Sequence, residues 1–107
     1  MPKYMVVLSY SAEGFKALEK STARGRREWI GAALERVGGK LESLYFTADE
    51  ADLIAIYDVP DTTTATGIML AASILGTGRV RVTPLLTAEQ LDGAFEKGVS
   101  YRSAPFP

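Results

Sequence analysis

The chain contains no cysteine and no histidine. Without cysteine it can form no disulfide, thiolate nucleophile, zinc–sulfur site or iron–sulfur cluster. Without histidine it lacks the commonest general base and metal ligand, so Ser/His/Asp and Cys/His catalytic arrangements are excluded. A metal would need carboxylates alone, and no calcium-loop pattern occurs. We therefore expect no cofactor, and any catalytic acid or base would have to come from Tyr, Asp, Glu, Arg or the ligand itself.

The chain also lacks an excess of either charge. Twelve basic and 13 acidic residues give a net charge of −1, so no bulk positive field attracts nucleic acid or an anionic membrane. The longest candidate membrane stretch, residues 67–76, is too short to span a bilayer. The first residues carry one basic side chain and no signal-peptide cleavage pattern. We expect a cytoplasmic protein that binds neither nucleic acid nor membrane.

The length and composition suit one globular domain. The chain has 107 residues, close to the commonest domain size, and 47% of them are hydrophobic. A chain of this size can bury one core and no more. No segment is long and polar enough to divide it, so we expect a single domain over residues 1–107.

The order of the expected elements points to a known architecture. Runs rich in β-branched and aromatic residues predict strands over 3–10, 40–47, 52–59 and 79–86. Helical spacing and capping residues predict helices over 12–20, 26–37, 62–75 and 88–97. The first two helices are expected to form one helical unit with a bend or break near Gly25. The resulting β-α-β-β-α-β order with a terminal helix is the ferredoxin-like split βαβ arrangement. The expected fold is α+β, with helices on one face of a four-stranded antiparallel sheet.

The strands are apolar on both faces. An antiparallel sheet in a lone domain usually has one packed face and one wet face. Residues 4–8 (Tyr-Met-Val-Val-Leu) and 53–57 (Leu-Ile-Ala-Ile-Tyr) do not alternate in that way. The second face therefore needs cover, and the chain has helices for only one face. We expect a homodimer or higher homo-oligomer whose sheets pack face to face as a dimeric α/β barrel.

The two-residue period of a strand assigns side chains to faces. Val7 and Ser9 are expected on the open face of the first strand, and Arg81 on that of the fourth. In the third strand, Ile54 and Ile56 are expected toward the helices. That choice leaves the open face with Leu53, Ala55 and Tyr57. In the second strand, either Leu44 and Phe46 or Ser43 and Tyr45 point outward.

The predicted open face supplies four candidate ligand-binding residues, which are Ser9, Tyr45, Tyr57 and Arg81. The fifth candidate is Asp52, a carboxylate close to Asp49 and Glu50. Two interpretations remain open. In one, Arg81 meets a carboxylate or tyrosine across a dimer interface, where arginine is common. In the other, Arg81, Tyr57 and Ser9 line a small cavity for an anionic or aromatic ligand.

Three further segments carry expectations about packing. Trp29 lies in an apolar helical stripe and is expected in the core. Leu91, Ala94 and Phe95 are expected to form the buried face of the last helix. Tyr101 and Phe106, in the tail over residues 100–107, could bridge neighbouring copies.

The sequence resembles the GYD-domain family of small bacterial and archaeal proteins over nearly its whole length. The resemblance rests on three segments: Lys-Tyr at 3–4 leading to Ser-Tyr at 9–10, Gly-Gly-Lys-Leu-Glu at 38–42 followed by Tyr-Phe at 45–46, and Val-Arg-Val-Thr-Pro-Leu-Leu-Thr at 80–87. Where the family has Gly-Tyr-Asp, this chain has Glu50, Ala51 and Asp52. The resemblance implies a ferredoxin-like fold related to the dimeric α/β-barrel group, and it implies no particular reaction.

Two classes of function remain. The first is an oligomeric module for small-ligand binding or assembly, without catalytic residues. The alternative is a small cofactor-independent oxygenase or isomerase of the dimeric-barrel kind. In that enzyme Arg81 would stabilise developing negative charge and Asp52 would be the base, beside Tyr57.

Overall fold

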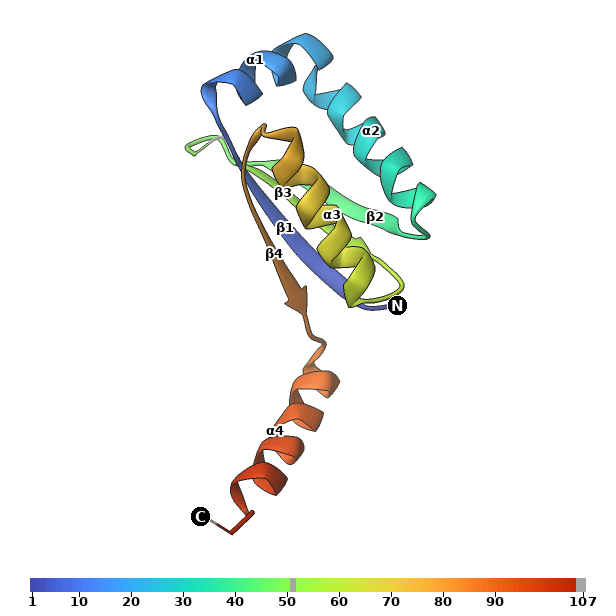
Figure 1. Ribbon diagram of the computed structural model, residues 1–107, viewed down its shortest axis with the longest axis vertical. Helices are drawn as coiled ribbons and strands as arrows, with labels where there is room; N and C mark the ends of the chain where they lie inside the picture. Colours follow the sequence, from blue (N-terminus) through green and yellow to red (C-terminus); the bar gives the residue numbers. More distant parts are fainter. Residues whose placement is uncertain (51, 106–107) are drawn as a thin grey trace.

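The computed structural model describes residues 1–50 and 52–105. Its elements follow in the order β1 (Lys3–Tyr10), α1 (Ala12–Ser21), α2 (Ala23–Arg36), β2 (Lys40–Phe46), β3 (Leu53–Asp58), α3 (Thr62–Leu75), β4 (Gly78–Leu85) and α4 (Ala88–Arg102). Figure 1 shows the sheet with its covering helices and α4 standing apart. The predicted α+β fold is confirmed, with a four-stranded antiparallel sheet in a ferredoxin-like order of elements.

The strand β1 lies at the centre of the sheet. The strand order is β2-β3-β1-β4, and β1 pairs antiparallel with both β3 and β4. Tyr4 stands opposite Tyr57, while Val7 stands opposite Ile54 and Arg81. Residues directly opposite one another share a face of the sheet. The register of β1 therefore decides which side chains of its neighbours lie together.

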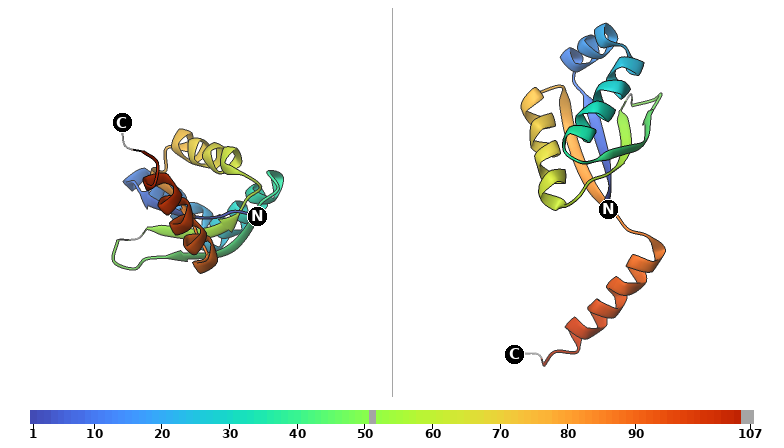
Figure 2. Two further views of the ribbon diagram at one scale, coloured as in Figure 1. Left: turned by 90° about the horizontal axis from the view of Figure 1, so that it is seen from below. Right: turned by 90° about the vertical axis from the view of Figure 1, so that its right-hand side faces the viewer.

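One face of the sheet is covered by helices of the same chain. In Figures 1 and 2, α2 and α3 lie over the same side of the strands. The buried cluster beneath them consists of Tyr4, Leu34, Tyr57, Val59 and Ala65. The partly buried side chains that pack against this cluster are Val6, Ile30, Leu41, Ile68 and Val82. The face that carries Tyr4 and Tyr57 is therefore the core face.

The predicted facing of β3 is wrong. Leu53, Ala55 and Tyr57 are each 1% exposed and lie on the helix face, not on the open face. Ile54 and Ile56, expected toward the helices, lie on the opposite side, because they pair with Val7 and Met5 of β1. Every position of β3 from Leu53 to Tyr57 is apolar, so hydrophobicity alone does not distinguish the two alternations. Pairing with β1 therefore determines which residues of β3 face the helices.

Two helix boundaries also differ from the prediction. α2 begins at Ala23, since the Thr22 side chain accepts a hydrogen bond from the Gly25 amide at 3.0 Å and caps the helix. The break between α1 and α2 falls at Thr22, whose φ of 68° is left-handed, and not at Gly25. α4 continues to Arg102, through Gly98, because a single glycine weakens a helix without ending it.

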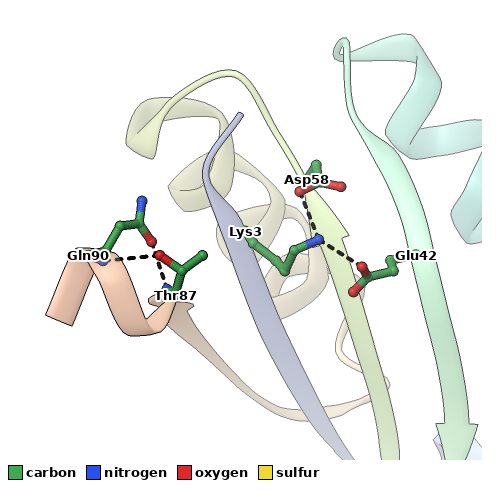
Figure 3. Close-up of polar contacts among 5 residues, drawn as sticks. All are labelled: Lys3, Glu42, Asp58, Thr87 and Gln90. Carbon is green, nitrogen blue, oxygen red and sulfur yellow. Dashed lines mark hydrogen bonds and ion pairs between the residues drawn. The ribbon is translucent and has the colours of Figure 1, made fainter. Parts of the chain in front are cut away.

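The helix α4 projects away from the rest of the molecule. The chain measures 58 × 26 × 24 Å, and α4 accounts for the long dimension in Figure 1. The predicted burial of its apolar stripe is wrong within one chain, since Leu91 is 47% and Phe95 66% exposed. The capping box of Thr87 and Gln90 starts the helix, with hydrogen bonds of 2.8 and 3.1 Å drawn in Figure 3. α4 is thus well capped but has no packed side.

An ion-pair cluster joins three strands at one end of the sheet. The Lys3 ammonium of β1 lies 3.0 Å from Glu42 of β2 and 3.1 Å from Asp58 of β3 (Figure 3). Hydrogen bonds to Glu42 and then to Asp58 raise the pKa of Lys3 above its ordinary value. The side chains are partly exposed to solvent, so their main effect is on strand alignment and not on stability.

A pair of glycine substitutions tests the packing of α1 against the loop before β4. The Ser11 amide donates to the Thr77 carbonyl at 3.0 Å, and a Cβ atom on Gly14 would collide with that carbonyl oxygen. We expect Gly14→Ala to lower the free energy of unfolding by about 2 kcal/mol. Gly31→Ala, where a Cβ atom meets no neighbour, should raise it by roughly 0.5–1 kcal/mol. Urea unfolding measures both, and equal effects at the two sites would contradict this packing.

Candidate functional site

The five predicted site residues do not form one site. Ser9, Tyr45 and Arg81 lie on the open face of the sheet, while Tyr57 lies on the helix face. Asp52 precedes β3 and closes the β2–β3 connection. Its amide donates to the Thr47 hydroxyl and its carbonyl accepts from the Thr47 amide, at 2.9 and 2.8 Å. The sheet itself therefore separates Tyr57 from Arg81.

On the open face, Tyr45 and Arg81 belong to one row across the sheet. The register places side by side Tyr45 of β2, Ile54 of β3, Val7 of β1 and Arg81 of β4. Tyr45 is 72% exposed at one edge, and Arg81 lies exposed at the other. Three strand spacings separate them, roughly 14 Å. The two residues therefore lie at opposite edges of the sheet, and this register resolves the ambiguity of β2 with Ser43 and Tyr45 outward.

The centre of the open face is apolar. The adjacent row contains Ser43, Ile56, Met5 and Thr83. Four partly exposed side chains form this centre, and we call them the apolar patch: Met5, Val7, Ile54 and Ile56. Ser9 lies beyond the patch and stands opposite Arg79. The face thus has an apolar middle with Arg79 and Arg81 along the β4 edge.

On the helix face, Tyr57 is held in the core by its neighbours. Its ring stacks on that of Tyr4, with centroids 6.2 Å apart, and the Tyr4 hydroxyl lies 3.1 Å from the Thr62 hydroxyl. The Tyr57 hydroxyl is buried and has no hydrogen-bond partner within the described residues. Burial, with a smaller effect of Tyr4, raises the pKa of Tyr57 to about 12. Its hydroxyl therefore remains a protonated donor at any physiological pH.

A cleft opens beside Tyr57, between α2, α3 and the sheet. Its volume is about 490 Å³, within the range of small-molecule sites. The walls come from β1, α2, β3, α3 and β4, with polar exceptions at Arg26, Tyr57, Thr64 and Thr77. Small residues of α3 contribute to one wall, and these are Gly67, Ala71 and Ala72. Because they are small, α3 leaves space between itself and α2.

Two residues at the mouth of this cleft, Arg26 and Trp29, are not among the predicted site residues. Trp29 was expected in the core, but it is 54% exposed and lines the cleft. The Arg26 guanidinium lies 5.7 Å from the centre of the Trp29 ring, in a cation–π arrangement. The Arg26 Nε is buried without a partner in the described part of the chain. The spacing of Arg26 and Trp29, three residues apart on one helix, was the available signal.

The acidic residues of the β2–β3 connection do not form a metal site. The Asp49 carboxylate accepts a hydrogen bond from the Glu50 amide at 2.9 Å, which makes it part of the turn. Among residues 1–50 and 52–105, no three His, Cys, Asp or Glu side chains come together as metal ligands. The replacement at Ala51 and the expectation for Phe106 lie outside the described residues.

The observed fold is consistent with the family to which the sequence is matched. The strand order and the helix-covered sheet define an α+β protein with a ferredoxin-like arrangement. The GYD-domain family model matches residues 4–95, from β1 into α4, so the chain belongs to the GYD-domain family. Comparisons with curated proteins and with solved structures find no match. In the described part of the chain, no helix combines the length and apolarity that crossing a bilayer requires.

Ionisation of Tyr57 should make stability depend on alkaline pH. Its pKa is about 12 in the folded protein and close to 10 in the unfolded chain. The unfolded chain then loses this proton first, so the free energy of unfolding is unaffected below pH 10 and falls as pH rises toward 12. In Tyr57→Phe, the free energy of unfolding should lack the part of this decrease that ionisation of Tyr57 causes. Urea unfolding at pH 8 to 11.5 measures the difference, and parallel curves for both proteins would contradict the assignment.

Proposed function

We propose that this protein is a homo-oligomeric assembly module whose sheet pairs face to face with the sheet of a second copy. The observation that supports it best is the apolar patch on a sheet face that no helix in the described part of the chain covers (Figure 2). Monomeric proteins keep most such surface out of water, and contiguous apolar patches mark interaction sites. A second copy of the same face is the simplest cover, since a two-fold interface is self-complementary.

The positions of Tyr45 and Arg81 favour one arrangement of the two copies. If the two-fold axis runs parallel to the strands, the β4 edge of each copy lies over the β2 edge of the other. Tyr45 and Arg81 share a row, so this places Arg81 over Tyr45 of the partner subunit. A guanidinium stacked on a tyrosine is a favourable interface contact. The arrangement corresponds to a dimeric α/β barrel.

The helix α4 supplies a second surface for contact between copies. A helix of 15 residues is marginal in water without tertiary packing, yet its apolar stripe contacts no other element extensively. Leu91, Phe95 and Val99 are spaced four apart on one side and are all exposed. We propose that a neighbouring copy covers this stripe in the assembled protein.

The alternative of a cofactor-independent oxygenase or isomerase loses its geometric basis. That reaction needs Tyr57, Arg81 and Asp52 around one substrate. Tyr57 faces the helices, Arg81 faces away from them, and Asp52 lies in the hairpin connection. A ligand on the open face would likewise lack Tyr57 as a wall, so we do not propose a site there.

A charge in the apolar patch tests the sheet-to-sheet interface. We expect the wild-type protein to be a dimer or a multiple of dimers by native mass spectrometry. Val7→Glu places an unpaired carboxylate at the centre of the interface and should lower the affinity between copies at least a hundredfold. Ala32→Glu, which adds the same charge on the exposed side of α2, should leave assembly unchanged. A monomeric wild type, or a Val7→Glu protein that assembles normally, would refute the proposal.

A double-mutant cycle tests the arrangement of the copies. Arg81→Ala and Tyr45→Ala should each weaken dimerisation, and the double variant should lose less than the sum. We expect a coupling energy of about 0.5–1 kcal/mol for each contact, measured by sedimentation equilibrium. Arg79→Ala combined with Tyr45→Ala is the matched control, since Arg79 lies in another row. Additive effects for Arg81 and Tyr45 would exclude the axis parallel to the strands.

A further inference from the structure

The cleft between α2 and α3 lies on the opposite side of the sheet from the proposed interface. It is walled by Val6 and Leu8 of β1, Leu53 of β3, Ile30 of α2 and Ile68 of α3. A core of this size ordinarily closes over such side chains at close-packed density. Here about 490 Å³ stays open beside exposed Trp29, so the space is accessible from solvent.

Two residues that line this apolar cleft each carry a buried polar atom without a partner in the described part of the chain. The Tyr57 hydroxyl belongs to a residue that is 1% exposed, and the Nε of Arg26 is also buried. Buried donors without an acceptor are rare in folded proteins, and each needs an explanation. Arginine offers only donors and remains charged, and the tyrosine hydroxyl can donate. Both groups therefore call for an acceptor, and Arg26 favours an anionic one.

The two groups lie toward opposite ends of the cleft. Tyr57 stands opposite Tyr4, near the start of β1. Arg26 lies in the first turn of α2, which begins beside α1 at the other end of β1 (Figure 1). The charge of Arg26 also opposes the rise in the pKa of Tyr10 that burial causes. Six residues of a strand separate Tyr4 from Tyr10, roughly 20 Å. The residues that carry the two donors thus lie toward opposite ends of the cleft, and this placement favours an elongated occupant with a polar group at each end.

We propose that this cleft binds an elongated aliphatic carboxylate that carries a second polar group at its far end. The carboxylate pairs with Arg26 at the mouth, beside Trp29. The chain lies along the apolar walls, and the far oxygen accepts a hydrogen bond from Tyr57. This inference is independent of the proposed sheet-to-sheet interface, because the cleft and the apolar patch lie on opposite faces of the sheet.

Matched probes and the protein's own fluorescence test the proposal. Trp29 is the single tryptophan and lines the cleft, so its emission should report occupancy. We expect saturable binding of 10-hydroxydecanoate and of decanoate to the full chain, with the hydroxy acid about fivefold tighter because of one extra hydrogen bond. Tyr57→Phe should remove that preference and leave decanoate affinity unchanged.

Three further variants separate the charge, the space and the fold. Arg26→Gln should weaken both probes about tenfold or more, while Arg24→Gln, an exposed arginine outside the cleft, should weaken neither. Gly67→Leu should abolish binding by filling the cleft, since a side chain there meets open space. That change also replaces a helical glycine, so the variant should fold at least as stably. Val7→Glu should bind both probes normally, whatever its oligomeric state.

Several results would overturn the proposal. The wild-type protein would show no saturable binding of either probe, or Gly67→Leu would bind the probes with the same affinity as the wild type. A preference for 10-hydroxydecanoate that persists in Tyr57→Phe would also overturn it. The proposal would also be overturned if the Trp29 emission changed when the protein was diluted but did not change with either acid. That result would mean that α4 of a second copy fills the cleft.

Discussion

The placement of α2 and α3 on one side of the sheet is the constraint on which the rest of the molecule depends. The strands are apolar on both faces, but the chain provides helices for only one. On the covered side this produces the core around Tyr4, Tyr57 and Val59. On the other side it leaves the apolar patch and the β4 arginines in water. Removing apolar surface from water is the main favourable force in folding and association, so the same force that builds the core favours a second copy.

The two sides of the sheet are suited to different tasks. The open face has a polar edge and an apolar middle, which is the anatomy of a protein interface. The covered face contains a cleft with buried donors, which is the anatomy of a small-molecule site. Because successive residues of β1 and β3 point to opposite faces of the sheet, neighbours in sequence belong to different surfaces. Ile56 belongs to the apolar patch, for example, while Tyr57 belongs to the cleft. A ligand or partner that binds only the folded state would also stabilise this small domain by mass action.

Local patterns predicted the elements well, because each depends on nearby residues. Ser11, Asp61 and Thr87 cap helices through hydrogen bonds to amides three residues on, and such spacing is visible in the sequence. The facing of β3 was not predictable in the same way. Its residues are uniformly apolar, so only the partner strand distinguishes one alternation from the other. Trp29 was misplaced for a related reason. A helical stripe shows that a side chain points inward, but not whether the opposing helix is close enough to bury it.

The sequence by itself determined the order of strands and helices, the absence of cysteine and histidine chemistry, and the excess of apolar sheet surface over helices to cover it. These follow from composition and from periodicities that span a few residues. Only the tertiary structure decided that Tyr57 and Arg81 lie on opposite faces, that Tyr45 and Arg81 share a row, and that Arg26 and Tyr57 line one cleft. Those relations arise from pairing between strands and packing between helices far apart in the chain. A one-residue change of register would reverse every facing without altering any local pattern.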